Sequence, residues 1–277
     1  MVKNILRVAL KEFDNLISNK FTIIIIFVYM IMLLISSYNI SIILNLPNIS
    51  HFQGMTSSDF LNCLAVSLIE YGSVIAAVIG FCSISIEKNG NTLNTLVTKP
   101  LYRDTIINGK LIGCAFFLIF ISIIVSIMFF FAWTIFMGNI VNVSLDLFMF
   151  YLLVILLVSW VCQLIFLSVS ILLSIIIKDD IFAMFAGISV YLLMMAYIPN
   201  ATFAMSLGSI FGYKWTALIA SLAPNNLTYG IIKNTVNISG DLVNNFLSYS
   251  PAVIVLLIYL TIAVFLSYIV FIRRDVS

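Results

Sequence analysis

The chain has 277 residues, of which 63% are hydrophobic and only 9% are charged, and its formal net charge is +2. Soluble domains carry about 25% charged residues, and no compact fold of this length has enough interior to hide so many apolar side chains. The composition therefore excludes an ordinary soluble protein and indicates a polytopic membrane protein. The basic residues are spread over several segments rather than gathered in a patch, which argues against nucleic acid as a partner.

Residues 3–18 have the pattern of an amphipathic helix that precedes the first long apolar segment. Apolar residues recur at helical spacing between Ile5 and Ile17, while Lys3, Arg7 and Lys11 fall on the other face. Such a helix lies in the membrane interface with its basic face toward water. We therefore expect residues 1–20 to form a cytoplasmic interfacial helix. It is either a passive anchor or also one border of a docking site for a cytoplasmic partner.

Six segments are long and apolar enough to cross a bilayer, which takes about 20 mostly apolar residues. They are Phe21–Ile43, Phe60–Ile86, Leu111–Met137, Leu147–Ile177, Ile181–Ile198 and Pro251–Ile272. The predicted fold class is thus an all-α polytopic membrane protein with six transmembrane helices. Residues 1–277 are expected to form a single transmembrane domain.

The distribution of basic residues orients these spans. Eleven of the thirteen Lys and Arg residues fall before the first span, in the second-to-third and fourth-to-fifth connections, or after the last span. Only Lys214 and Lys233 fall on the opposite side. Because cytoplasmic loops carry the excess of Lys and Arg, both termini are expected in the cytoplasm of a cell whose cytoplasmic membrane holds the protein.

The polar connection 87–110 separates the second and third spans. Gly90 permits a sharp change of direction, Thr92 or its neighbour can cap a short helix, and Pro100 stops that helix. The predicted helix carries three apolar side chains that the groove of a partner could accept, Leu93, Leu96 and Val97. A second helix is expected to begin near Asp104 and to enter the third span near Lys110.

This connection resembles a motif of the membrane subunits of ABC-2-type transporters. The matching residues are Glu87, Gly90, Thr92, Leu93, Leu96, Pro100, Arg103, Ile106, Ile107, Gly109 and Lys110. The chain departs from the motif where Asn91 separates Gly90 from Thr92, which inserts one residue, and it keeps the spacing from Thr92 to Lys110. The outline of the chain is similar to the family as well, with an amphipathic N-terminal helix, six spans, a long outer segment and a basic tail.

The resemblance implies a type V exporter-like permease in which residues 87–110 hold the coupling helix that docks on a cytoplasmic ABC ATPase. The coupling residues would be Glu87, Gly90, Thr92, Leu93, Leu96, Val97, Pro100, Arg103, Gly109 and Lys110. The chain contains no G-x-x-x-x-G-K-[ST] phosphate loop, so ATP and Mg would be bound by the separate ATPase chain and this chain would need no cofactor. Arg103 and Lys110 could pair with acidic residues of that partner or with anionic lipid headgroups.

A path between two copies would need only one face of each subunit, so the permease is expected to act as a homodimer or with a paralogous permease. Three alternatives stay open: an intramembrane enzyme, an ion-coupled carrier, and a permease-derived assembly subunit that does not transport. The first needs clustered catalytic groups within the spans and the second needs several deep charges, and the sequence offers neither.

Glu70 is the acidic residue that lies deepest in a predicted span. An intramembrane carboxyl group is costly and by default faces a cavity, a pathway or a partner helix. Two interpretations remain: Glu70 contacts the transported cargo, or its carboxyl group packs against another helix. In the second case Gln163 of the fourth predicted span is a candidate hydrogen-bond partner.

The short turn 178–180 and the segment 199–250 complete the chain. Asp179 and Asp180 either cap the fifth span or, as the resemblance implies, form a smaller second contact with the ATPase. Segment 199–250 is too weakly apolar to span again, but Ala201–Phe211 and Trp215–Leu222 are predicted as short helices. These helices either enter the outer leaflet as re-entrant elements that gate an exit or form an ordered outer cap.

Overall fold

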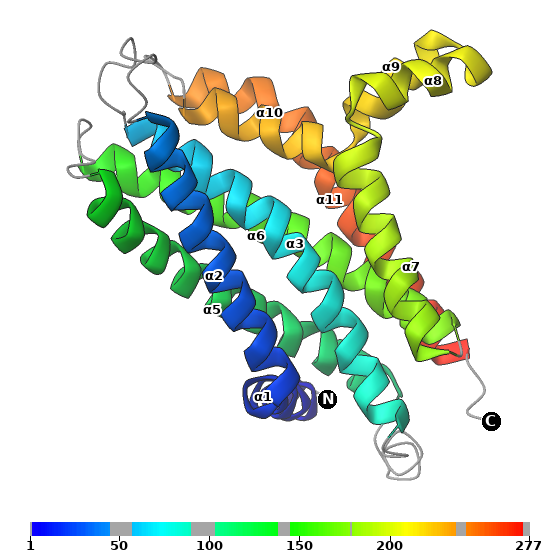
Figure 1. The fold of residues 1–277 in the computed structure, drawn as a ribbon. Helices are drawn as coiled ribbons and strands as arrows, with labels where there is room; N and C mark the ends of the chain where they lie inside the picture. Colours follow the sequence, from blue (N-terminus) through cyan, green and yellow to red (C-terminus); the bar gives the residue numbers. More distant parts are fainter. Residues whose placement is uncertain are drawn as a thin grey trace.

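The computed structural model describes residues 2–44, 57–89, 103–137, 145–177, 179–236 and 242–273. Every element within these ranges is a helix (Figure 1). In chain order they are α1 (Val2–Ser18), α2 (Lys20–Leu44), α3 (Ser57–Asn89), α5 (Arg103–Met137), α6 (Leu145–Ile176), α7 (Asp180–Leu192) with a π-helical turn (Leu193–Tyr197), α8 (Ala201–Phe211), α9 (Tyr213–Leu222), α10 (Pro224–Val236) and α11 (Leu242–Arg273). The predicted all-α class is confirmed.

Six of the described helices are long and apolar enough to cross a membrane, with mean hydropathies from 1.7 to 2.9. Their apolar parts are Lys20–Asn39, Asp59–Ser85, Asp104–Phe136, Phe148–Ile176, Asp180–Tyr197 and Ser250–Arg273. These are the six segments predicted from the sequence. The third begins earlier than predicted because α5 continues without a break from Arg103 through Lys110 into the membrane-spanning part.

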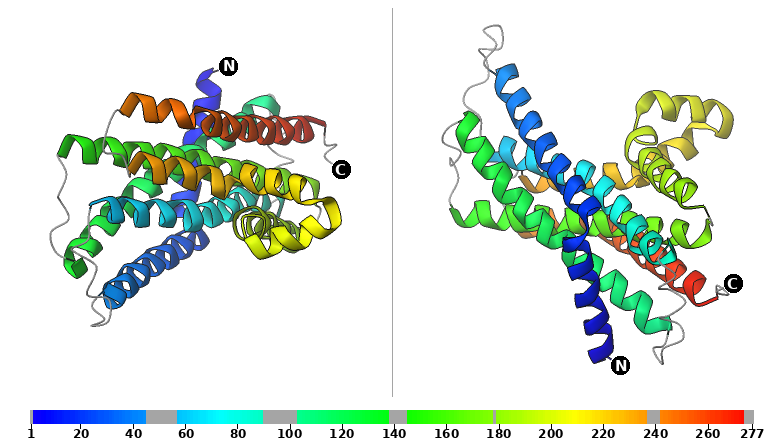
Figure 2. Two further views of the ribbon diagram at one scale, coloured as in Figure 1. Left: turned by 90° about the horizontal axis from the view of Figure 1, so that it is seen from above. Right: turned by 60° about the horizontal axis from the view of Figure 1, so that its bottom comes forward.

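α1 crosses one end of the bundle instead of continuing the direction of α2 (Figures 1 and 2). The chain bends at Asn19, whose side-chain oxygen accepts a hydrogen bond of 2.9 Å from the backbone N–H of Phe21. This contact satisfies one of the free N–H groups at the start of α2. The ends of α3, α6 and α11 and the start of α5 lie toward this same end, which we call the α1 end.

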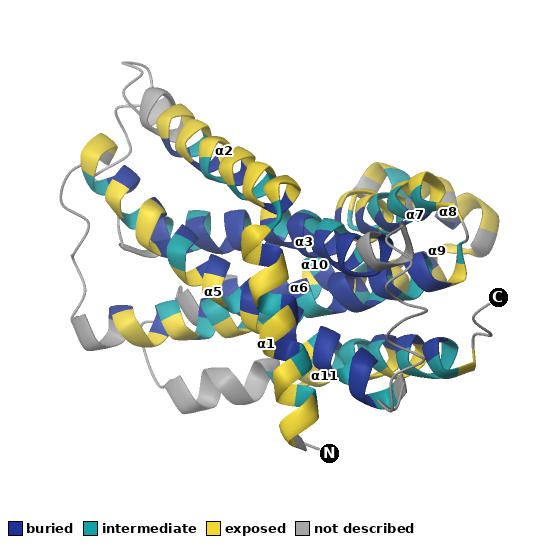
Figure 3. Cartoon of the chain, turned by 90° about the horizontal axis from the view of Figure 1, so that it is seen from below, coloured by how far each residue is buried: buried dark blue, intermediate teal, exposed yellow. Residues whose placement is uncertain are grey.

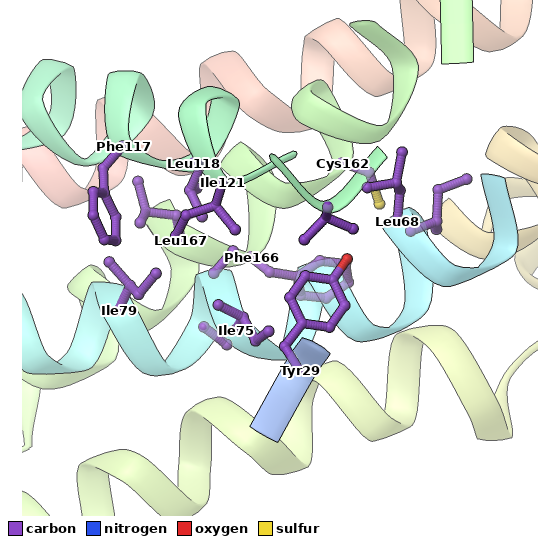
Figure 4. Packing of buried hydrophobic residues seen from close by; sticks show 14 of the residues in the cluster. Tyr29, Leu68, Ile75, Ile79, Phe117, Leu118, Ile121, Cys162, Phe166 and Leu167 are labelled. Atoms are coloured by element: carbon purple, nitrogen blue, oxygen red, sulfur yellow. The ribbon is translucent and has the colours of Figure 1, made fainter. Parts of the chain in front are cut away.

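The centre of the bundle is the contact between α3 and α6. Of the apolar part of α3, 67% is buried, against 44% or less for the other five spans. Small residues on α3 let the two helices approach: a Cβ atom at Gly80 would lie 2.6 Å from the carbonyl oxygen of Leu167. The Ser170 hydroxyl donates a hydrogen bond to the carbonyl of Ala77. Figure 3 shows buried residues along α3 and α6, and Figure 4 shows side chains of the buried cluster around this contact.

Aromatic rings pack together at the opposite end of the bundle. The ring of Phe60 on α3 lies 5.5 Å from Phe129 and 5.4 Å from Trp133, both on α5, and 5.8 Å from Phe148 on α6. Edge and tilted contacts of this kind add to the area that large aromatic side chains bury. The cluster therefore holds α3, α5 and α6 together at the end opposite α1.

Between the fifth and sixth spans the structure describes three helices, α8, α9 and α10. α8 and α9 match the two predicted short helices, and Gly212, with a φ of +92°, makes the turn between them. α10 was not predicted, because Pro224 and two asparagines suggest a loop, whereas Pro224 is the first residue of the helix, where proline is well tolerated. The Asn225 side chain donates to the carbonyl of Met195 at 2.7 Å and so ties α10 to the end of the fifth span.

Candidate functional site

A buried ion pair joins three helices at the α1 end. Lys110 of α5 is 1% exposed, and its Nζ atom lies 3.1 Å from Oε2 of Glu12 on α1. Lys110 also donates a hydrogen bond of 2.8 Å to the carbonyl of Ser83 on α3. The Ser83 hydroxyl in turn donates to Oε1 of Glu12 at 2.7 Å. We call these three residues the α1 junction.

The α1 junction keeps two charges out of water and supplies each with a partner. Burying an ion is expensive, and the mutual attraction and the extra hydrogen bonds offset this only when the geometry is good. Removing one of the two charged side chains, Glu12 or Lys110, would leave the other buried and unpaired, at a cost of about 3–5 kcal/mol. The junction therefore sets one position of α1 relative to α3 and α5.

Two glycines on α5 let α1 reach this position. A Cβ atom at Gly109 would lie 2.6 Å from Cβ of Val8, and one at Gly113 would lie 2.6 Å from the carbonyl oxygen of Ala9. Glycines four residues apart form a groove on one face of a helix, into which a second helix packs closely. In the predicted motif Gly109 thus has a packing role, because it admits the backbone of α1 beside α5.

A second polar contact links α3 to the start of the fifth span. The Ser85 hydroxyl donates a hydrogen bond of 2.9 Å to the carboxylate of Asp180. The neighbouring Asp179 caps α7, because its side chain accepts from the backbone N–H groups of Ile181 and Phe182. The predicted capping role is confirmed for Asp179, while Asp180 is turned toward α3.

The other motif residues are placed only in part. Gly90, Thr92, Leu93, Leu96, Val97 and Pro100 lie outside the described residues. Glu87 belongs to the last turn of α3, and Arg103 is the first residue of α5. The expected pairing of Lys110 with a partner or with lipid is corrected, since Lys110 is buried against Glu12 in the same chain.

Gln163 was expected as a candidate hydrogen-bond partner of the Glu70 carboxyl group. The structure corrects this, because both ends of the Gln163 amide group contact other residues. Its Nε2 atom donates to the carbonyl of Leu68 at 3.0 Å, and its Oε1 atom accepts from the hydroxyl of Ser122 at 3.2 Å. Gln163 is 1% exposed, so it bridges α3, α5 and α6 inside the core. Glu70 itself is partly buried, and its backbone carbonyl accepts a hydrogen bond of 3.0 Å from the hydroxyl of Tyr191.

Glu12 was missed in the sequence, although a signal was present. It lies three residues after Ala9 and four before Leu16, which are 4% and 2% exposed, so it belongs to the buried face of α1. A carboxylate on the apolar face of an amphipathic helix needs a cation. The sequence does not show which basic residue this would be, because that depends on how α1 packs against α5.

The described residues form six apolar helices long enough to cross a membrane, and a buried ion pair holds the amphipathic helix α1 to them. They define a multi-pass helical membrane protein. Among the described residues, no group of three or more His, Cys, Asp or Glu residues could hold a metal ion. Residues 6–276 match the family described as ABC-2 family transporter protein, and the chain therefore belongs to that family. No curated protein matches the chain. It is a transporter membrane subunit.

Proposed function

We propose that this chain is the permease subunit of an ABC transporter that exports cargo across the cytoplasmic membrane, with ATP bound and hydrolysed by a separate ABC ATPase chain. The observation that carries the proposal is the family match over residues 6–276. The six spans and the residues of the coupling motif support it.

The orientation follows from the charges at the α1 end. Basic residues of α1, the first residue of α5 and the last residue of α11 belong to this end of the bundle (Figure 1). Excess positive charge marks the cytoplasmic side of a membrane protein. The α1 end then faces the cytoplasm, where an ATPase can reach the connection 87–110.

Coupling begins at this connection. ATP binding draws two ATPase subunits together, and a docked helix between Gly90 and Pro100 moves with its subunit. The connection continues directly into α3 on one side and α5 on the other. The α1 junction passes the displacement to α1, and the contact between Ser85 and Asp180 passes it to α7. Four helices then respond to one docking event.

Two copies of the chain, or this chain and a paralogous permease, enclose the path. A two-fold interface supplies both walls from the same face of each subunit. The exposed apolar side chains of the six spans provide surface for this contact and for lipid. An intramembrane enzyme, an ion-coupled carrier and a non-transporting assembly subunit are less well supported, because the match is to a transporter family.

The docking step is tested by co-expressing the full chain with a candidate ABC ATPase and measuring co-purification and ATPase stimulation. Replacing Leu93, Leu96 and Val97 by Asp places charge on the face that docks, so the complex is expected to be lost. The matched control replaces Asn94, Thr95 and Thr98 by Asp, which adds the same charge to the other face and leaves the complex intact. Normal binding and stimulation by the first variant would refute the docking.

A further inference from the structure

One side of α3 is left partly uncovered in the single chain, although α3 is the most buried span. Tyr71, at 37% exposed, is the most exposed of its described side chains. Partly buried residues recur at helical spacing along the same side, Cys63, Val66, Glu70, Val74 and Val78. We call them, with Tyr71, the α3 strip. It is apolar except for one carboxyl group near the middle of the span.

Tyrosines from two other helices approach the strip at this carboxyl group. The hydroxyl of Tyr29 on α2 donates to the carbonyl of Ser67 at 3.3 Å, and the rings of Tyr29 and Tyr71 meet edge to face with centroids 6.5 Å apart. On the other side, Tyr191 of α7 donates to the carbonyl of Glu70 and lies within electrostatic range of its carboxylate. Figure 1 shows α3 between α2 and α7, and Figure 4 shows Tyr29 beside the core.

The Glu70 carboxylate has no partner in the described part of the chain. Among the described residues no hydrogen bond or ion pair reaches it, whereas the buried carboxylate of Glu12 has both Lys110 and Ser83. An unpaired carboxylate at this depth is unfavourable, and a counter-charge there would be bound strongly because the surroundings have a low dielectric constant.

We propose that the α3 strip binds an amphipathic organic cation, an apolar molecule or peptide segment that carries an ammonium, phosphonium or guanidinium group. The positive charge pairs with Glu70 and contacts the ring of Tyr71, since aromatic faces attract cations. The apolar part lies along Val66, Val74 and Val78. This site rests on the proposed transport function and identifies the chemical class of the cargo.

The charge of Glu70 favours this occupant over a second copy of the chain. A two-fold contact that covered the strip would bring two Glu70 carboxylates toward each other in a low-dielectric region. Like charges at such a distance repel and prevent both groups from ionising. A bound cation removes this repulsion, so the strip is complementary to a cation and not to itself.

The test is direct binding of radiolabelled tetraphenylphosphonium to the purified full chain in nanodiscs of phosphatidylcholine, without any ATPase. The wild type is expected to bind this cation and to discriminate against tetraphenylborate, which has a similar size and a negative charge. Glu70→Gln keeps the size and removes the charge, so it should weaken cation binding by about tenfold or more. Tyr71→Leu should weaken it severalfold.

The matched control is Asp14→Asn, which removes one negative charge from the exposed face of α1, away from the strip, and should leave the affinity unchanged. Wild-type affinity in Glu70→Gln would overturn the proposal, as would equal binding of the two tetraphenyl ions. A Glu70→Gln variant that alters only the dimer population would assign the strip to a contact between copies and would also overturn it. If Glu70→Gln does not fold, unchanged affinity in Tyr71→Leu has the same consequence.

Binding to the permease alone also separates this proposal from the docking proposal. A chain that carries Asp at Leu93, Leu96 and Val97 should lose the ATPase and still bind tetraphenylphosphonium. Conversely, Glu70→Gln should bind the cation more weakly and still co-purify with the ATPase. Failure of one proposal therefore leaves a distinct pattern from failure of the other.

Discussion

Two glutamates, Glu12 packed against α3 and Glu70 within it, have different surroundings. Glu12 reaches α3 at the α1 end, where it is 6% exposed and has Lys110 and Ser83 as partners. Glu70 lies near the middle of α3, is only partly buried, and has no partner for its carboxylate in the described chain. A satisfied buried charge holds helices in register, while an unsatisfied one at a partly open face is available to a ligand. The same residue type thus serves structure at one point and, in our proposal, recognition at another.

The largest expected effect comes from breaking the α1 junction. Lys110→Met should destabilise the protein by about 3–5 kcal/mol, because Glu12 is left buried and unpaired. The double variant Glu12→Leu with Lys110→Met should regain most of that stability, since neither charge is then buried. Unfolding of the purified chain in mixtures of mild and denaturing detergent measures both. Equal stability of the single variant and the wild type would show that the junction is not formed.

A smaller loss is expected from closing the glycine groove of α5. Gly113→Ala places a methyl group against the carbonyl oxygen of Ala9 and should cost about 1–3 kcal/mol as α1 is pushed away. Gly230→Ala on α10 is the matched control, because no atom lies within 4 Å of the added Cβ. Cross-linking of cysteines placed on α1 and α5 reports the separation. Undisturbed cross-linking in Gly113→Ala would contradict this packing.

The smallest effect sharpens the comparison of the two glutamates. Glu70→Gln should change the free energy of unfolding by no more than about 0.5 kcal/mol, because its carboxylate makes no ion pair or hydrogen bond within the described part of the chain. Glu12→Gln, the same chemical change at the α1 junction, should be clearly destabilising. The two variants are compared in the same detergent unfolding assay. If both lose stability equally, Glu70 has a structural partner that the single chain does not contain.

Sequence patterns predicted well what depends on short stretches of chain. The run of apolar residues in α2 or α6 predicts a spanning helix wherever it stands, because length and hydrophobicity decide insertion. The shorter apolar run of α8 likewise predicts a helix, although one too short to span. α10 was missed because proline often marks a loop, whereas Pro224 is the first residue of this helix. The helix between Gly90 and Pro100 lies outside the described residues and stays a prediction.

The candidate site was less predictable, because its contacts join residues far apart in the chain. Lys110 stands in a motif that suggests an exposed partner contact, yet it pairs with Glu12, 98 positions away. Gln163 of α6 was expected to contact Glu70 of α3, yet it forms hydrogen bonds with Leu68 and Ser122. Which faces of two helices meet depends on their crossing angle and register, and no short pattern encodes either.

By itself the sequence determined the class of protein, the six spans and the amphipathic helix α1, because hydrophobic length and helical periodicity are local properties. Only the tertiary structure decided which polar groups are satisfied inside the bundle. It paired Glu12 with Lys110, made Gln163 a bridge between helices, and gave the carboxylate of Glu70 no partner among the described residues. The physical reason is that the cost of burying a charge depends on which groups surround it, and those groups come together only when the helices pack.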